Sequence, residues 1–165
     1  MAKNASLPNV TLRAVTPADD EFLLAVYGSS RAEELAQVQW AEGQKEQFLR
    51  WQFDLQRRDY DSRFPDAEYA VILFDESQAG RIWIERDDQE IHLLDIAILP
   101  EFQNRGIGTL LLQQLIDESV RTQKPLHHTV FVLNADAHRF YERLGFVDID
   151  DVGAYQRMEY RSATE

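Results

Sequence analysis

The sequence predicts an α+β fold, in which a mixed, mostly antiparallel sheet of six to seven strands is flanked by about four helices. Two observations lead to this fold. Between residues 67 and 98, three apolar runs are separated only by short polar connections, which is typical of antiparallel strands that follow one another. Between residues 90 and 133, a strand, a helix and a second strand follow in turn, and such a unit is expected to form a right-handed parallel crossover.

The composition is that of one globular domain. The chain has 165 residues, of which 44% are hydrophobic and 28% charged, so we expect a single domain over residues 1–165, with residues 1–8 as a flexible tail. The lack of cysteine excludes disulfides, thiol nucleophiles and cysteine-ligated zinc, and it fits a reducing compartment. No signal-peptide pattern or membrane-length apolar run is visible, so the expected location is cytoplasmic, without a membrane partner.

The net charge of −12 restricts the classes of partner. Nucleic acid is excluded as a partner, because a phosphate backbone calls for a basic protein face. A cationic acceptor such as an amine is compatible with the charge, although acidity by itself also keeps a protein soluble. An anionic cofactor would have to be held by local groups against this overall field.

The first part of the chain reads as one strand followed by helices. Residues 10–15 alternate apolar and polar side chains, as a half-buried strand does. Thr16 as N-cap, followed by proline, begins a helix that reaches Gly28, and Ser29 or Ser30 can cap a second helix. A third helical pattern runs from residue 44 to about residue 60.

Aromatic side chains in this helical part allow two interpretations. Trp40, Trp51 and Phe53 could line a substrate pocket. Aromatic residues at helical spacing more often pack into the core, so core packing is the preferred interpretation.

The second part of the chain alternates strands and helices. Strands are expected over 67–74, 81–86, 90–98, 126–133, 146–150 and 154–160, and helices over 107–123 and 135–144.

A strand, a glycine-containing turn and a helix start follow one another between Ile96 and Gly108. Pro100 ends the strand, and the first turn of the following helix offers backbone N–H groups that have no partner within the helix, with the positive end of the helix dipole behind them. Gly106 and Gly108 carry no Cβ, so a phosphate could approach the backbone closely. We interpret the segment as a pyrophosphate-binding loop. The alternative is that two glycines merely shape a tight connection.

Two better-known nucleotide motifs do not fit this loop. A dinucleotide fingerprint would need its third glycine where Leu111 stands, and a Walker A loop would need Gly-Lys-Ser/Thr, which does not occur in the chain.

Two strings together resemble the GNAT superfamily of acyl-CoA-dependent N-acyltransferases. The string 103–108, Gln-Asn-Arg-Gly-Ile-Gly, fits the Gln/Arg-x-x-Gly-x-Gly/Ala pyrophosphate motif of this superfamily. The string 134–146 looks like its second cofactor segment: Asn134, Ala137 three residues later, Tyr141 seven residues later, and a closing Leu-Gly-Phe. The order of elements matches over nearly the whole chain.

The resemblance implies acetyl-CoA as acyl donor and a sheet whose two central strands splay apart. The pantetheine arm would pair with the backbone of Ile96, Ala97 and Ile98, the loop amides would hold the pyrophosphate, and Asn134 would hydrogen-bond the pantetheine arm. The residues implied to bind the cofactor are Ile96, Ala97, Ile98, Gln103, Asn104, Arg105, Gly106, Ile107, Gly108, Thr109, Asn134, Ala137 and Tyr141.

The resemblance also places Tyr141 at the position of the general acid. A phenol aimed at the sulfur can hydrogen-bond or protonate the thiolate as it leaves. Asp95 is the candidate base for the amine, because it lies in the strand that borders the expected cleft and a carboxylate in an apolar strand needs a reason. It could equally cap backbone or pair with an arginine. Glu90 and His92 are weaker candidates for the base.

No metal is expected. His127 and His128 are expected at the mouth of a strand, and no acidic cluster at metal-ligand spacing accompanies them, so they are not interpreted as ligands. The resemblance also implies no metal.

The sequence thus predicts an N-acetyltransferase that moves an acetyl group from acetyl-CoA to a primary amine, by direct attack in a ternary complex. The acceptor, a small molecule or a peptide, cannot be read from the sequence. A homodimer is compatible with the resemblance, since dimers are common in the superfamily, but no residue pattern indicates one. A non-catalytic acyl-CoA sensor or interaction module is the alternative, and an unrelated α/β domain with a fortuitous glycine turn is a third reading.

Overall fold

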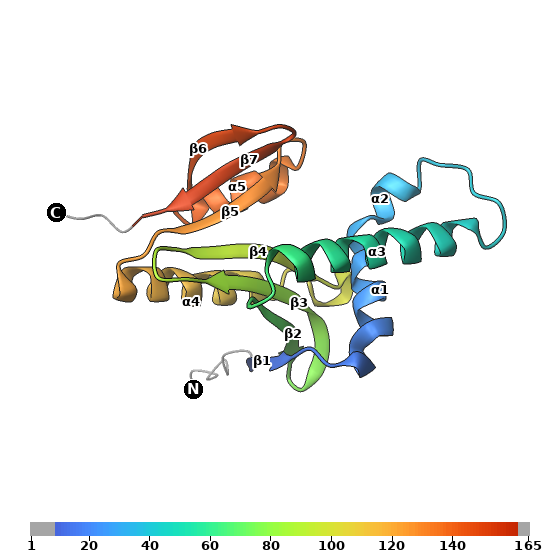
Figure 1. Cartoon of the computed structure of the whole chain (residues 1–165), viewed down its shortest axis with the longest axis horizontal. Coiled ribbons are helices and arrows are strands. Elements are labelled where there is room, and N and C mark those ends of the chain that lie inside the picture. Colours follow the sequence, from blue (N-terminus) through green and yellow to red (C-terminus); the bar gives the residue numbers. More distant parts are fainter. Residues whose placement is uncertain (1–8, 162–165) are drawn as a thin grey trace, which may run out of the picture. The chain divides into compact units, whose positions relative to one another are not determined.

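The computed structural model describes residues 9–161, which form a seven-stranded sheet with the strand order β1-β2-β3-β4-β5-β7-β6 and the helices that accompany it (Figure 1). The mixed α+β fold expected from the sequence is confirmed. Two compact units make up the chain: unit 1 holds the residues up to Ile82 and Ile96–Ile107, and unit 2 holds Trp83–Asp95 and the residues from Gly108 onward. The single-domain organisation stays a prediction, and the expected tail over residues 1–8 lies outside the described residues.

The elements follow the predicted order. Unit 1 contains β1 (Val10–Ala14), the 3-10 turn η1 (Pro17–Asp19), α1 (Asp20–Ser30), α2 (Ala32–Leu35), α3 (Gln44–Arg63), β2 (Glu68–Phe74), the start of β3 (Ser77–Arg86), the end of β4 (Ile91–Ile98) and η2 (Pro100–Phe102). Unit 2 contains the rest of β3 and β4, α4 (Ile107–Thr122) from its second residue, β5 (Leu126–Phe131), α5 (Ala135–Arg143), β6 (Val147–Val152) and β7 (Tyr155–Tyr160). Among residues 9–161, no helix combines the length and the apolar character that crossing a membrane requires.

In unit 1, α1 and α3 pack against each other through a small apolar core. Leu23 and Tyr27 of α1 and Phe53 of α3 are buried together, with the Tyr27 and Phe53 rings 6.0 Å apart. Arg50 of α3 forms an ion pair with Asp20 of α1 at 2.7 Å, at the edge of the contact between the two helices. The contact between these helices is therefore apolar inside and ionic at its edge.

The expected core role of the aromatic residues is right for Phe53 and wrong for Trp51. Phe53 is 1% exposed, whereas Trp51 is 59% exposed on the outer side of α3. Trp40 is half-buried, and its indole N–H donates to the Leu35 carbonyl at 2.9 Å. The helical period does not say which of two apolar faces turns inward, and here Leu49 and Phe53 pack inward.

A buried carboxylate fixes the start of α1 to β1. Asp19 is 4% exposed, and both of its carboxylate oxygens accept from the Arg13 guanidinium, at 2.8 and 2.9 Å. The Thr16 backbone N–H also donates to Asp19, at 2.8 Å, as expected of a helix start at Thr16. Hydrogen bonds from Arg13 hold the pKa of Asp19 well below its usual range, so the carboxylate stays charged.

Two local expectations are corrected by the structure. Ser29 and Ser30 do not cap a second helix; their hydroxyls donate to the carbonyls of Val26 and Tyr27 in the last turn of α1. Strand β3 begins at Ser77, because Asp75 and Glu76 take positive φ angles of 46° and 70° and close the turn after β2 within two residues. A turn without glycine leaves little signal in the sequence.

In unit 2, β5 is the central strand. It pairs in parallel with β4 over three residue pairs, from Ile91↔Leu126 to Leu93↔His128, and antiparallel with β7 along its whole length. β7 then pairs with β6, whose register shifts between Asp148 and Asp150. Along α4, the side chains of Leu111, Leu112, Leu115 and Ile116 are buried.

One backbone contact in unit 1 requires a glycine. At Gly80 in β3, a Cβ would lie 2.2 Å from the Ala97 carbonyl oxygen and 3.0 Å from the Ile98 Cα. The same end of β4 is held by the Leu99 N–H, which donates to the Ala79 carbonyl at 2.8 Å. The position of residues 96–98 therefore depends on the absence of a side chain at residue 80.

We expect Gly80→Ala to destabilise the protein by about 1–3 kcal/mol, because the added methyl group overlaps backbone that cannot move away cheaply. Chemical denaturation measures the loss. Gly28→Ala is the matched control: its Cβ would meet only Leu49 Cδ1, at 3.5 Å, and alanine is the better helix former. Equal stability of the two variants would contradict the importance of this contact.

Candidate active site

The predicted strand-turn-helix segment is present. β4 ends at Ile98, η2 follows at Pro100–Phe102, and α4 begins at Ile107. The Gln103 side-chain amide donates to the Ile98 carbonyl at 2.9 Å, which holds the turn against the end of the strand. Asn104 and Gly106 take left-handed φ angles of 61° and 81°, so the chain turns twice before the helix starts. The turn is therefore a defined loop that leads directly into a helix N-terminus.

Gly106 is favoured by the backbone conformation at this position and not by a lack of room for a side chain. A Cβ there would meet no described atom within 4 Å, but its φ of 81° is one that side chains disfavour. Residues 103–106 are exposed, so the loop amides lie open to a ligand.

The loop carries a positive charge of its own. The Arg105 guanidinium carbon lies 5.8 Å from the Phe74 ring centre and 5.7 Å from the Phe102 ring centre. These rings hold the arginine by cation–π contact while it stays exposed. The first turn of α4 contains no acidic side chain that would oppose an anion. Loop, arginine and helix start can thus receive a diphosphate in spite of the acidic composition.

In unit 2, the pairing of β4 with β5 ends early. The last registered pair is Leu93↔His128, whereas β5 runs on to Phe131 in register with β7. The Leu93 carbonyl accepts a hydrogen bond from the His128 imidazole at 2.7 Å. The predicted strand pair is therefore joined only over its first part within unit 2.

Tyr141 lies next to the end of this strand pair. It is 4% exposed on α5, and its ring contacts His128 at 4.9 Å, Phe140 at 5.3 Å and Phe146 at 5.3 Å, measured between ring centres. Burial, with a smaller effect from the Asp95 charge, raises the pKa of the Tyr141 hydroxyl. Tyr141 is thus a phenol that keeps its proton near neutral pH and can donate a hydrogen bond or act as a weak acid.

His128 is the site residue that the sequence analysis did not select. Because a carbonyl can only accept, the Nδ1 that faces Leu93 must carry the hydrogen, and Nε2 then holds the lone pair of the neutral ring. Burial lowers the pKa of His128, and the Leu93 carbonyl and the Asp95 charge oppose this shift. The imidazole is therefore neutral near pH 7. His128 lies two residues from each of the buried Leu126 and Val130, so the three side chains share one face of β5. This spacing was the signal in the sequence that could have identified His128 as an inward-facing residue.

Asp95 acts electrostatically on both of these groups, since its charge raises the pKa of Tyr141 and of His128. The two residues selected as acid and base, Tyr141 and Asp95, thus belong to one cluster in unit 2, together with His128.

The other polar candidates form a second group in unit 2. His92 and His127 stand opposite each other in the β4–β5 register, with their rings stacked at 4.1 Å, and Glu90 Oε1 lies 3.1 Å from His127 Nε2. Because neighbouring residues of a strand point to opposite faces, His127 and His128 do not share a site. Within the described residues, no group of three or more His, Cys, Asp or Glu side chains is arranged to hold a metal ion.

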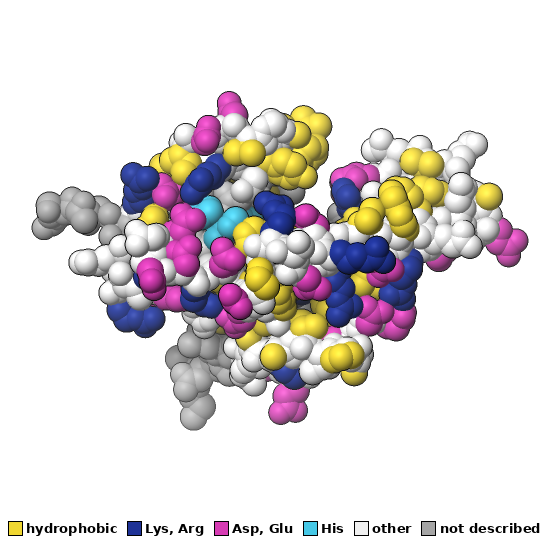
Figure 2. Space-filling view, viewed as in Figure 1, with side chains coloured by type: hydrophobic (Ala, Val, Ile, Leu, Met, Phe, Trp, Pro, Cys, Tyr) yellow, Lys and Arg dark blue, Asp and Glu magenta, His cyan; other side chains and the backbone are white. Residues whose placement is uncertain are grey.

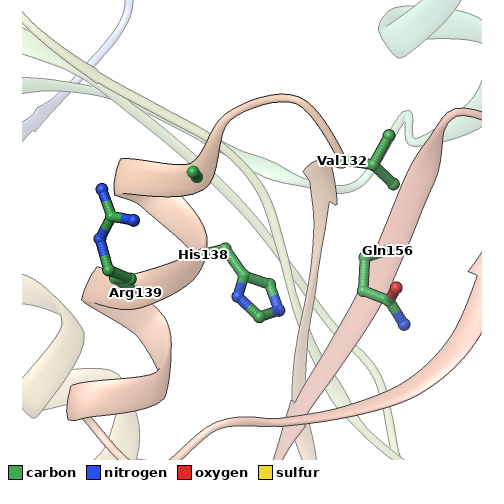
Figure 3. A pocket seen from close by; sticks show the side chains of 5 residues that line it. Val132, His138, Arg139 and Gln156 are labelled. Carbon is green, nitrogen blue, oxygen red and sulfur yellow. The ribbon is translucent and has the colours of Figure 1, made fainter.

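The second predicted cofactor segment begins α5. The Asn134 side chain accepts from the Ala137 backbone N–H at 3.1 Å and so caps the helix. Beside this cap lies a hollow of about 230 Å³, lined by Val132, Ala135, His138, Arg139 and Gln156 (Figure 3).

The hollow is smaller than the pockets that enclose whole ligands, about 300–1,000 Å³. His138 points from α5 toward the strands, and its ring lies 2.8 Å from Asp148 and 2.5 Å from Glu142 (Figure 3). This hollow is therefore a minor feature beside Asn134 and does not enclose a cofactor.

Comparison with known proteins agrees with these features. The model of the acetyltransferase (GNAT) family matches residues 32–146. An uncharacterized N-acetyltransferase of Methanocaldococcus jannaschii is 31% identical over 163 residues, which cover 92% of this chain and 66% of that protein. The [ribosomal protein bS18]-alanine N-acetyltransferase of Salmonella typhimurium is 47% identical over 58 residues, 34% of this chain and 39% of that protein.

The fold also matches a solved structure. PaiA N-acetyltransferase from Thermoplasma acidophilum, in complex with coenzyme A, superimposes with a TM-score of 0.68 at 21% identity, over 93% of this chain and 99% of that one. The chain spans 66% and 39% of the lengths of the two relatives above. Because the family model covers most of its length, the chain belongs to the acetyltransferase (GNAT) family.

Proposed function

We propose that the chain is an N-acetyltransferase, which moves an acetyl group from acetyl-CoA to a primary amine by direct attack in a ternary complex. The observation that carries the proposal is the cluster of Tyr141, His128 and Asp95, at the point in unit 2 where the β4–β5 register ends. In this reaction the amine nitrogen bonds to the acetyl carbon and the carbon–sulfur bond breaks. The sulfur leaves as a thiolate. An amine that arrives as a cation gives up one proton before it attacks and a second proton when the amide forms.

The cofactor-binding role rests on the loop and on the start of α5. Backbone amides from Asn104 to Thr109, with Arg105 beside them, suit a diphosphate. The backbone of Ile96, Ala97 and Ile98 is proposed to pair with the pantetheine arm. The coenzyme A complex of the Thermoplasma acidophilum enzyme supports the same ligand for this fold.

Tyr141 is proposed to stabilise the leaving thiolate. Its pKa is raised, so the hydroxyl is protonated at every pH at which the enzyme would work. A thiol has an ordinary pKa of about 8.5, so a phenol with a raised pKa donates a hydrogen bond to the thiolate more readily than it gives up its proton. Stabilisation of developing charge, rather than full proton transfer, is the role that this environment favours.

Asp95 and His128 are proposed to receive the proton of the amine. A neutral imidazole with its lone pair on Nε2 is a proton acceptor near pH 7. The Asp95 carboxylate stabilises the cation that would result, which is why its charge raises the pKa of His128. Asp95 thus remains a candidate base, and His128 is proposed as a second residue that receives the proton.

The proposed acceptor is a cationic amine or a peptide amine. The net charge of −12 attracts cations, and the Salmonella typhimurium relative is named for acetylation of an alanine of a ribosomal protein. A non-catalytic acyl-CoA-binding module is the second candidate. The proton-holding Tyr141 beside a neutral histidine favours the enzyme, because binding alone requires neither.

The proposed function is tested by thiol release from acetyl-CoA, followed with a thiol reagent across a panel of polyamines, aminoglycosides, amino acids and basic peptides, with the acetylated products identified by mass. We expect release that depends on one class of amine. Binding of acetyl-CoA without release for any amine would favour the binding module.

Tyr141→Phe should lower kcat by about 10–1,000-fold and change the affinity for acetyl-CoA little, because only the hydroxyl that faces developing charge is lost. Stopped assays give kcat, and calorimetry gives the affinity. Phe140→Leu is the control, since it alters a neighbouring ring without removing a hydroxyl. Unchanged turnover in Tyr141→Phe would remove this residue from the mechanism.

Gly108→Leu should abolish coenzyme A binding, because its side chain would stand in the first turn of α4, where the diphosphate is proposed to lie. Calorimetric titration with coenzyme A measures the loss. Gln113→Leu adds the same side chain at an exposed position further along α4 and should bind normally. Equal binding by the two variants would contradict the proposed position of the diphosphate.

Asp95→Asn should lower the pKa of His128 further, because the carboxylate charge raises it in the unaltered protein. NMR titration of the His128 ring protons measures the shift without any substrate. In the enzyme assay, the acidic limb of the pH–rate profile should move to lower pH, since the base then stays neutral in more acidic solution. A His128 titration curve that does not move would contradict the proposed coupling.

A further inference from the structure

Strand β5 carries a second histidine, on the face opposite to His128. His127 is 4% exposed, and it stands opposite His92 in the middle one of the three pairs that join β4 to β5. The two rings stack, with 4.1 Å between their centres. The proposed mechanism makes no use of His127, so a buried ionisable side chain at this place needs a separate explanation.

Charged side chains of both signs surround His127. Glu90 Oε1 lies 3.1 Å from His127 Nε2, and the Arg157 guanidinium lies 3.5 Å from the other oxygen of Glu90. Glu159 stands opposite His127 in the β5–β7 register, is buried, and pairs with Arg161 at 2.6 Å. In Figure 2, histidine side chains come to the surface between acidic and basic side chains. The charged and titratable groups around His127 in unit 2 are Glu90 and His92 of β4, Arg157 and Glu159 of β7 with the following Arg161, the neighbouring His128, and Asp87 and Lys124 in the turns before β4 and β5.

The position of the hydrogen on the neutral His127 ring follows from these neighbours. A carboxylate repels a lone pair, so Nε2, which faces Glu90, carries the hydrogen and Nδ1 holds the lone pair. Nδ1 is buried and has no hydrogen-bond partner among the described residues. A proton taken up by the ring goes to Nδ1, where no acceptor meets the new N–H. Because a buried cation with an unsatisfied N–H is costly, protonation favours a position of the ring in which Nδ1 reaches water.

We propose that His127 is an acid-sensitive latch on the β4–β5 pair: uptake of a proton moves its ring out of the buried position, loosens the pairing and releases His128 from the Leu93 carbonyl. His127 belongs to the middle pair, and the next pair holds His128 through the 2.7 Å contact of its ring with Leu93. Only three pairs join the strands, so loss of the middle one leaves that contact with little support. The consequence for catalysis, a reversible loss of activity in acid, rests on the proposed function.

The direction of the pH effect follows from the surroundings of His127. Burial lowers its pKa and the Arg157 charge adds to this shift, whereas the charges of Glu90 and Glu159 oppose it. In the unfolded chain the ordinary value of about 6.5 applies. The unfolded state therefore takes up the proton at a higher pH than the folded state does. The stability that His127 contributes is complete above about pH 6.5 and is lost as the pH falls below it.

NMR titration of the histidine ring protons of the full chain, without substrate, tests the latch. We expect the His127 midpoint to move to lower pH in Glu90→Gln, which removes an attractive charge, and to higher pH in Arg157→Gln, which removes a repulsive one. The Nδ1–H of His128, which the Leu93 carbonyl protects, should begin to exchange with water at the His127 midpoint and should follow that midpoint in both variants.

Glu33→Gln is the control for the loss of one acidic charge, because Glu33 is an exposed residue of α2. It should leave both histidine signals unchanged. Midpoints that do not move in opposite directions in the two cluster variants would overturn the proposal. So would a His128 Nδ1–H that stays protected below the His127 midpoint.

His127→Phe keeps a ring that can stack on His92 but cannot take up a proton. Between about pH 7.5 and about pH 5.5, its denaturation midpoint should fall less than that of the unaltered chain. In the enzyme assay, the acidic limb should approach a hundredfold loss per pH unit in the unaltered chain, where His127 and His128 both take up protons, and about tenfold in His127→Phe. If no amine is acetylated, the proposed function fails, and the NMR and denaturation measurements still decide on the latch. Equal acid sensitivity of His127→Phe and the unaltered chain would overturn it.

Discussion

Three residue pairs join β4 to β5 in parallel, and the proposed chemistry of unit 2 depends on their ending where they do. At the last pair, the Leu93 carbonyl takes its hydrogen bond from the His128 side chain. That contact fixes which ring nitrogen carries hydrogen and holds the ring beside Tyr141. A strand pair that continued would offer the carbonyl a backbone partner, and the imidazole would lose its orientation. The proposed chemistry of His128 therefore depends on the point at which the β4–β5 pairing ends.

The loop is the proposed diphosphate site of a chain that is acidic as a whole. Charges further apart than a Debye length, about 8 Å at physiological salt, are largely screened, so the net charge matters less to a bound diphosphate than the groups beside it. Those groups are backbone amides, Arg105 on its two phenylalanine rings and a helix start without acids.

The features that the sequence predicted well are those whose signal is local. Pro100, the two glycines and the apolar spacing of α4 lie within a few turns of chain, and the strand-turn-helix segment follows them. The features that it missed depend on contacts between distant segments. Whether Trp51 or Phe53 turns inward is decided by α1, and His128 gains its role from Leu93, 35 residues earlier. Ser29 and Ser30 had an equally good local alternative, hydrogen bonds to the preceding turn.

The edge of the sheet at β6 has features that disfavour pairing with a further strand. Every residue of β6 is exposed, and its register with β7 is shifted between Asp148 and Asp150. An irregular strand that carries three aspartates at 148, 150 and 151 presents repelling charge and an uneven row of backbone groups to any strand that approaches. Pairing of this edge with a strand of another molecule, the first step of cross-β stacking, is thereby disfavoured.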